Sequence, residues 1–375
     1  MNVLLDAPFW LAALAATVLM RLPWPARPMQ RFGLLNALAL TAVFGWRAAL
    51  TAGVLSAVVW LSLRNGGAGQ RAAAVVAAAV MLFVAHKLHL EGLVTRGPLD
   101  LLARLAWSYA FLRVCDAALS VGAGARLADP LTLSGFLFPF HMLLAGPIGA
   151  YRAHLAADED GATRPDDSAE GLVAGLDLAT TGLFFKLVLA EALRIFAFGL
   201  DGPLRTTGWF DSALLLVYLF FDFAGVSLVA LGIGRLLGVP TPVNFDRPFL
   251  AQSLTDFWQR WHASLGAWVR AHLFLPLQVR LVRAWGVRRA YAAGLLVLVA
   301  SFGFVGAWHR FDSRFLLWGL GMGTALALEK LARDRLLRRD WARGPLVTRA
   351  WRVVGPAYVF AVITLSLHPL WEILL

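Results

Sequence analysis

The sequence predicts an all-α integral membrane protein, because both its composition and its hydrophobic runs are typical of this class. Of the 375 residues, 59% are hydrophobic and only 15% are charged, whereas soluble domains carry about 25% charged residues. Apolar runs long enough to cross a bilayer, about 20 residues each, recur along the chain. The hydrocarbon offers no water to backbone groups, so these runs should be helices. The period-two alternation of a porin strand is absent.

About eleven apolar segments are expected to form transmembrane or re-entrant helices, which make one membrane-embedded domain over residues 1–375. In chain order they lie near 8–21, 33–48, 50–64, 72–90, 100–121, 129–150, 171–199, 210–237, 290–308, 314–330 and 353–373. Two stretches between or within them, 136–151 and the amphipathic 251–279, are expected to be re-entrant. No internal repeat and no separate soluble domain is recognised.

The charged residues predict which loops face the cytoplasm. The stretch 330–352 holds eight basic residues against two acidic ones, and four arginines cluster in 280–289. Basic loops remain on the cytoplasmic side of a membrane. The turn of the hairpin between these stretches, residues 308–312, is then expected on the far side of the membrane or partway across it. Acidic residues dominate the loop 152–170, but they say little about its side.

Composition also limits the partners. The net charge of +11 is expected at cytoplasmic loops and lipid headgroups, so no nucleic-acid partner is predicted. The single cysteine, Cys115, excludes an internal disulfide and a cysteine-based zinc site. His86 and His89 lie three apart with only Glu91 and Asp100 nearby in sequence, which is a weak basis for a metal site. We therefore expect neither a bound metal nor a bound cofactor.

A tryptophan-rich stretch at 244–270 carries ionisable residues at membrane depth, where each costs several kcal/mol unless it is paired or hydrated. Five apolar residues step by four, three, four and three and so share one helical face: Leu254, Trp258, Trp261, Leu265 and Trp268. Asp256 and Arg260 are four apart and can pair on another face. His262 lies at the edge of the apolar stripe. On spacing alone, an interfacial helix with tryptophan anchors and a satisfied histidine is favoured over a reaction site.

A second histidine, His309, ends a long apolar segment. It could cap that helix or meet lipid headgroups. It could equally transfer protons at a point that water can reach, because the pKa of an imidazole lies near neutrality. Gly303 and Gly306, in the same segment, are expected to allow close helix packing.

The longest recognisable motif occupies residues 256–270 and 274–277. It reads Asp-Phe-Trp-Gln-Arg-Trp-His-Ala-Ser-Leu-Gly-Ala-Trp-Val-Arg, then Phe-Leu-Pro-Leu. This motif resembles one in the membrane-bound O-acyltransferase family, in the bacterial branch that acylates exported polysaccharides such as alginate or D-alanylates teichoic acids. Three further resemblances are Phe-Pro with Ala-Gly-Pro-Ile in 138–148, Tyr-Leu-Phe-Phe-Asp-Phe-Ala-Gly at 218–225, and Trp-His with Leu-Trp-Gly in 308–319.

These matches span roughly residues 100–330, which the resemblance marks as the catalytic core. The chain departs from the family pattern at Gln259 and Arg310, where an arginine and a glycine are usual, and at His272. The resemblance implies helices around an intramembrane tunnel, with His309 as the base that takes the acceptor hydroxyl's proton. His262 would line the same tunnel and either hold the thioester carbonyl or orient the acceptor. By the same resemblance, the substrate-binding residues are Asp256, Trp258, Arg260, Trp261, Ser264, Trp308, Asp222 and Tyr218.

The implied activity is transfer of an acyl group, with acetyl expected, to a hydroxyl of an exported glycan or similar acceptor. The donor would be a cytoplasmic thioester of coenzyme A or of an acyl carrier protein. The implied location is the bacterial inner membrane, and related systems often include a periplasmic acyltransferase partner. Two alternatives stay open: a lipid or protein acyltransferase of the same fold, and a non-catalytic transporter or scaffold. Arg310 beside His309 gives some weight to the last, since a fixed positive charge lowers an imidazole pKa.

Overall fold

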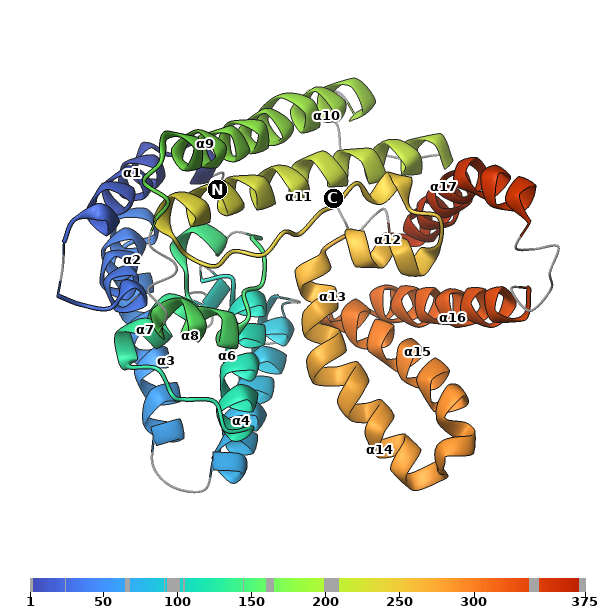
Figure 1. Cartoon of the computed structure of the whole chain (residues 1–375), viewed down its shortest axis with the longest axis horizontal. Helices are drawn as coiled ribbons and strands as arrows, with labels where there is room; N and C mark the ends of the chain where they lie inside the picture. Colours follow the sequence, from blue (N-terminus) through green and yellow to red (C-terminus); the bar gives the residue numbers. More distant parts are fainter. Residues whose placement is uncertain are drawn as a thin grey trace. The chain divides into compact units, whose positions relative to one another are not determined.

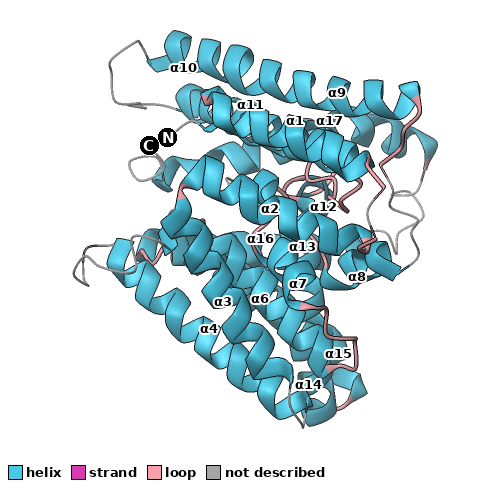
Figure 2. Cartoon of the chain, turned by 90° about the vertical axis from the view of Figure 1, so that its left-hand side faces the viewer, coloured by secondary structure: helices cyan, strands magenta, loops and turns pink. Residues whose placement is uncertain are grey.

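The computed structural model describes residues 3–23, 25–64, 68–90, 92, 102–103, 105–143, 145–159, 165–198, 209–336 and 344–370. Within these ranges the chain is helical, as predicted, and the strand-like pairing is one isolated bridge (Figure 2). Several predictions fall outside the described residues: 160–164 of the acidic loop, 337–343 of a basic loop, and Glu91, Asp100 and Leu144.

Seven helices in the described part are long and apolar enough to cross a membrane. They are Trp46–Arg64, Gly69–Leu90, Ala169–Phe196, Trp209–Leu237, Val287–His309, Ser313–Leu336 and Pro345–Leu367. A shorter apolar helix covers Ala7–Arg21. The chain is therefore an all-α polytopic membrane protein, and the predicted apolar segments fall on its helices. The segment 129–150 is interrupted, because its helix ends at Leu137 and a short 3-10 turn and a loop follow.

The chain divides into two compact units, the first formed by Met1–Lys186 and Phe223–Val243. Its helices are α1 (Ala7–Arg21), α2 (Pro28–Phe44), α3 (Trp46–Arg64), α4 (Ala68–Leu90), α6 (Trp107–Gly122), α7 (Pro130–Leu137), α8 (Tyr151–Glu159) and α9 (Ala169–Leu183) (Figure 1). The second half of α11 (Trp209–Leu237) also belongs to this unit.

A buried asparagine explains how unit 1 accommodates the break after α7. Pro139 has no N–H and so cannot donate the next helical hydrogen bond, which favours the end of the helix at this point. The side chain of Asn36, from α2, donates to the carbonyl of Phe138 at 3.0 Å and accepts from the N–H of Phe140 at 2.7 Å. Both backbone groups are thereby satisfied in a site where water is excluded.

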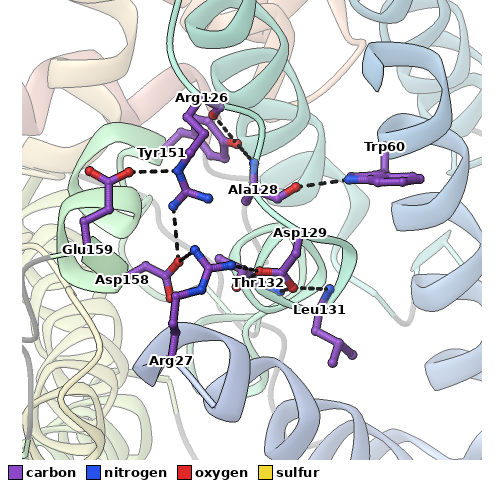
Figure 3. Close-up of polar contacts among 10 residues, drawn as sticks. All are labelled: Arg27, Trp60, Arg126, Ala128, Asp129, Leu131, Thr132, Tyr151, Asp158 and Glu159. Atoms are coloured by element: carbon purple, nitrogen blue, oxygen red, sulfur yellow. Dashed lines mark hydrogen bonds and ion pairs between the residues drawn. The ribbon is translucent and has the colours of Figure 1, made fainter. Parts of the chain in front are cut away.

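Unit 1 also contains a network of ion pairs that links three segments far apart in the sequence (Figure 3). The Asp158 side chain on α8 is fully buried, and its Oδ2 lies 2.9 Å from Arg27 Nη1 and 3.2 Å from Arg126 Nη2. Arg27 also pairs with Asp129 and Arg126 with Glu159. The network joins the residue before α2, the loop after α6 and the end of α8.

We expect Asp158→Asn to lower the thermal stability of the purified protein. The substitution leaves two arginines without their shared anion. Breaking a buried pair costs about 3–5 kcal/mol, but both arginines are partly exposed, so we expect about 1–3 kcal/mol. Glu159→Gln, at a mostly exposed carboxylate, is the matched control. Equal melting temperatures for the two variants, measured by size-exclusion after heating, would contradict this assignment.

Unit 2 is formed by Leu187–Asp222 and Asn244–Leu375. Its helices are α10 (Ala190–Phe198), the first half of α11, α12 (Leu254–Arg260), α13 (Ala263–Val269), α14 (Leu275–Trp285), α15 (Ala290–His309), α16 (Ser313–Leu336) and α17 (Pro345–Leu367). Its core is a cluster of buried apolar side chains: Leu216, Ala251, Leu254, Phe257, Met322, Leu326, Val359, Ile363 and Leu367.

Glycines allow helices α15 and α16 of the hairpin to pack closely, and we call this line of contact the glycine seam. A side chain on Gly306 would collide with the backbone of Phe315, and one on Gly319 would collide with the backbone of Phe302. Gly303 lies against Leu320 in the same seam. The prediction that Gly303 and Gly306 permit close helix packing is thus confirmed, and the seam fixes the register of the two helices.

Candidate active site

The short helix α12 begins with a set of local hydrogen bonds. Ser253 caps it, and its Oγ accepts from the N–H of Asp256 at 3.0 Å. Asp256 Oδ2 accepts from the N–H of Gln252 at 3.0 Å, and Oδ1 lies 2.6 Å from Nε of Arg260. The predicted Asp256–Arg260 pair is confirmed. In this arrangement the pair holds the start of the helix.

The single helical face predicted through this motif is wrong, because the helix breaks directly before His262. Trp261 is extended and forms an antiparallel bridge with Phe245. The N–H of Ala263 donates to the carbonyl of Asn244 at 2.9 Å. Between them His262 has φ = 50°, a left-handed conformation that costs a non-glycine residue about 1–2 kcal/mol. Pairing with the preceding segment replaces the helical hydrogen bonds and directs the imidazole inward.

The protonated nitrogen of His262 can be assigned from its neighbours. The buried imidazole places Nδ1 3.0 Å from Oδ1 of Asn244. The same oxygen accepts from the backbone N–H of Ser264 at 3.3 Å and from its Oγ at 2.8 Å. Because an atom that accepts from a backbone N–H must be the amide oxygen, Nδ1 carries the hydrogen. Neutral His262 therefore presents Nε2 as its proton-accepting nitrogen.

His309, the last residue of α15, is held in the same tautomer by a different partner. Its Nδ1 lies 2.8 Å from the carbonyl oxygen of Val305, which can only accept. The side chain is exposed, unlike that of His262. In the turn that follows, the backbone N–H of Arg314 holds the pKa of Asp312 below its usual range. Because Nδ1 carries the hydrogen, the His309 imidazole offers Nε2 as a base at the end of α15.

Trp308 lies beside both histidines. Its buried ring is 6.4 Å from the His262 ring and 4.8 Å from the His309 ring, measured between centroids. Phe315 and Trp318 of α16 complete the aromatic surroundings of His309, at 6.4 and 6.3 Å. The structure thus brings together two histidines that are far apart in sequence.

The other predicted tryptophans pack on either side of α12. Trp258 contacts Phe302 at 5.3 Å and Trp318 at 6.0 Å between ring centroids. Its indole N–H is buried and has no hydrogen-bond acceptor among the described residues. Trp261 stacks on Phe257 at 5.4 Å, with the rings 19° from parallel. Trp258 therefore packs against the aromatic residues around His309, whereas Trp261 packs against α12 at the point where that helix ends.

Tyr218 and Asp222 occupy a second polar group on α11. They are one helical turn apart and hydrogen-bond to each other, and Glu191 and Arg194 of α10 are their charged neighbours. Arg194 and Glu191 form a bidentate pair at 2.9 and 2.6 Å. These contacts place Tyr218 beside the Glu191–Arg194 ion pair of α10.

Two residues with structural roles at this site were missed by the sequence reasoning. Asn244 orients His262, and Glu329 binds the start of α12 through the N–H of Leu254. Asn244 heads the polar stretch noted above, so its amide was a detectable signal. Glu329 could have been found as a carboxylate near the end of an apolar helix. Among the described residues, no group of three or more His, Cys, Asp or Glu side chains is placed to bind a metal ion.

The fold and this site together define a polytopic helical membrane protein with a pair of oriented imidazoles. Residues 204–361 match the model of the membrane-bound O-acyltransferase family. Over this segment the chain is similar to the membrane-bound O-acyltransferase family. Both histidines and all eight predicted substrate-binding residues fall within the matched segment.

Curated relatives belong to the bacterial branch of the family. The chain is 29% identical over 190 residues to a teichoic acid D-alanyltransferase of Bacillus subtilis, covering 49% of this chain and 48% of the relative. It is 31% identical over 203 residues to "Probable alginate O-acetylase AlgI" of Azotobacter vinelandii, with coverages of 53% and 38%. A Helicobacter pylori peptidoglycan O-acetyltransferase is 32% identical over 199 residues, with coverages of 52% and 36%. The chain thus spans half or less of the length of these relatives.

Proposed function

We propose that this protein is an O-acyltransferase that moves an acyl group, with acetyl expected, from a cytoplasmic thioester to a hydroxyl of an exported glycan or similar acceptor. The observation that carries the proposal is the tautomer of His309. A carbonyl holds its Nδ1–H, so Nε2 is a base on an exposed ring at the end of an apolar hairpin. The family match and the names of the relatives support the same chemistry.

The proposed reaction is a single acyl transfer. The acceptor hydroxyl donates to Nε2 of His309, and its oxygen attacks the thioester carbonyl as the proton moves to the imidazole. The tetrahedral intermediate collapses, the carbon–sulfur bond breaks, and the thiolate takes the proton back from His309. The products are an ester and a free thiol, and the base is restored. The reaction also requires that bulk water be kept from the thioester, which it would hydrolyse.

The structure supports one of the two roles left open for His262. Its Nδ1–H is already donated to Asn244, and an imidazolium so deeply buried would be costly. A neutral ring in this tautomer cannot donate to a thioester carbonyl, but its Nε2 can accept from a hydroxyl. We therefore assign His262 to orienting the acceptor. The buried N–H of Trp258 is the donor we assign to the carbonyl, where negative charge develops.

The predicted topology of the α15–α16 hairpin agrees with transfer from the cytoplasm to the opposite side of the membrane. The basic stretches flanking the hairpin predict that both of its outer ends face the cytoplasm. The turn that follows His309 would then face the opposite side, where an exported acceptor can reach it. The inner membrane of a bacterium is the location we propose on this basis.

The proposal can be tested with inside-out membrane vesicles that contain the protein. Acetyl-coenzyme A labelled with ¹⁴C, or the same acetyl group on an acyl carrier protein, is supplied from outside, and label is counted in lipid, protein and polysaccharide fractions. We expect label in polysaccharide, and much less with His309→Ala. Label confined to lipid or to a membrane protein would identify the lipid or protein acyltransferase alternative. Label on a periplasmic protein would identify a second acyltransferase that completes the transfer. Equal labelling by wild type and variant would indicate a scaffold or transporter.

We propose that the arginines of α14 and the following turn bind the phosphate-bearing donor. Arg280, Arg283, Arg288 and Arg289 are all exposed. Arg280→Glu combined with Arg283→Glu should raise the donor KM by about tenfold at low ionic strength while kcat stays unchanged. The effect should shrink as salt screens the charges. The control is the same charge reversal at Arg349 and Arg352, which are also exposed. An unchanged donor KM would show that the donor binds elsewhere.

A further inference from the structure

The carboxylate of Glu329 connects α16 to the short helix that precedes His262. Both of its oxygens face the backbone N–H of Leu254, Oε1 at 2.9 Å and Oε2 at 3.0 Å. Leu254 is the first residue of α12, and 75 positions of sequence separate the two residues. The Glu329 side chain is partly buried within a helix that is apolar enough to span the membrane. It lies near the end of α16, beside the basic stretch 330–352, and as a partly buried carboxylate it needs hydrogen-bond partners.

Glu329 provides something that the local caps of α12 do not. The first N–H groups of a helix have no partner inside the helix. Ser253 and Asp256 satisfy two N–H groups at this end from within the same segment. Glu329 satisfies the N–H of Leu254 from another helix, through a charge-assisted hydrogen bond. It thereby fixes the position of the first residue of α12 along α16. It also satisfies a backbone N–H at that end of α12.

A second contact between the same helices sets the rotation of α12 about its own axis. Eleven residues before Glu329, Trp318 packs against Trp258 of α12 at 6.0 Å between ring centroids. Trp318 also lies 6.3 Å from the ring of His309. Eleven residues of helix span about 16 Å, so α16 holds α12 at two separate levels. The aromatic contact is at the level of His309, and the carboxylate is at the opposite end of α12.

We infer that Glu329 is a positioning residue for acyl transfer: by holding the N–H of Leu254 it sets the register of α12 on α16, and so the placement of His262 relative to His309. His262 follows α12 after one extended residue, and His309 is joined to α16 by the hairpin turn. Any shift of α12 along α16 therefore changes the separation of the two imidazoles. This inference rests on the proposed function, because the imidazole pair is where transfer is proposed to occur.

The experiment compares Glu329→Ala and Glu329→Gln in lipid nanodiscs. Hydrogen–deuterium exchange is followed in the peptide covering 250–262, and kcat and donor KM are measured with ¹⁴C-acetyl-coenzyme A. Alanine removes the acceptor, so exchange at this peptide should rise and kcat should fall about 100-fold, the effect of a misplacement near 1 Å. Donor KM should change by less than about twofold, because Glu329 is not placed at the donor. Glutamine keeps an acceptor oxygen and should restore most of both properties.

Asp334→Asn is the matched control on the same helix. Asp334 pairs with Lys330 and accepts from the hydroxyl of Tyr291, so its loss removes a carboxylate of α16 that holds another helix. It should leave exchange at 250–262 and turnover unchanged. Unaltered exchange in Glu329→Ala, wild-type turnover in that variant, or a Glu329→Gln variant as defective as alanine would each overturn the inference. If wild type itself transfers no label, the proposed function fails, and the exchange measurement still decides whether Glu329 anchors α12.

Discussion

Replacing His309 with alanine should reduce kcat for acyl transfer about 10³-fold, and the donor KM should change little. The reduction follows from losing the base, since general-base catalysis contributes about 10²–10⁴-fold. The donor KM is expected to hold because the imidazole acts on the acceptor's proton, and donor binding is assigned to a different part of the chain. The measurement is steady-state label transfer in inside-out vesicles at matched amounts of inserted protein.

Two further variants make this result specific. His262→Ala should also lower kcat, by about 10²-fold, with a raised acceptor KM because it orients the hydroxyl. His89→Ala, a histidine of unit 1 on α4, should leave transfer unchanged. Full turnover in His309→Ala would remove the base from the mechanism. The transporter or scaffold alternative would then become the better account.

Replacing Asn244 with leucine should abolish most transfer although Asn244 itself is assigned no contact with substrate. The substitution removes the oxygen that accepts from His262 Nδ1 and from Ser264. His262 is then free to place its hydrogen on Nε2, the wrong nitrogen for accepting from a hydroxyl. A wrong tautomer costs a serine protease about 10⁴-fold in kcat. We expect about 10²-fold here, no more than the loss of His262 itself, because His262 orients the acceptor while His309 remains as the base.

The Asn244 result can be separated from simple unfolding. Asn244→Asp keeps an acceptor oxygen and should retain much more activity than Asn244→Leu. Ser264→Ala removes a donor to the same oxygen but leaves the hydrogen bond to His262, so its loss should stay below about tenfold. Equal activity in the leucine and aspartate variants, at similar melting temperatures, would refute the orienting role.

The membrane helices were predictable because their signal is local. A run of apolar residues and its length decide whether a segment can cross a bilayer, and no distant contact has to be known. The Asp256–Arg260 pair was predictable for the same reason, since four residues make about one helical turn. The glycines of the α15–α16 seam were also recognisable as packing positions, because small residues allow close helix approach.

The break at His262 was not predictable from periodicity. The spacing of Leu254, Trp258 and Trp261 fits a continuous helix, and the helix ends only because the chain pairs with the segment around Asn244 and Phe245. The role of Glu329 is likewise non-local, since its partner lies 75 positions away. Motif resemblance identified both histidines, but the neighbours that select their tautomers appear only in three dimensions.

The glycine seam of the α15–α16 hairpin has a consequence for how this sequence can vary in length. Each residue added to a helix rotates everything beyond it by about 100°. Gly306 and Gly319 fix the pairing of the two helices at their interface, so an insertion between Gly306 and His309 cannot be absorbed by sliding. It would turn the imidazole away from Trp318 and move it off its Val305 carbonyl. The number of residues between Gly306 and His309 is therefore as constrained as the histidine itself.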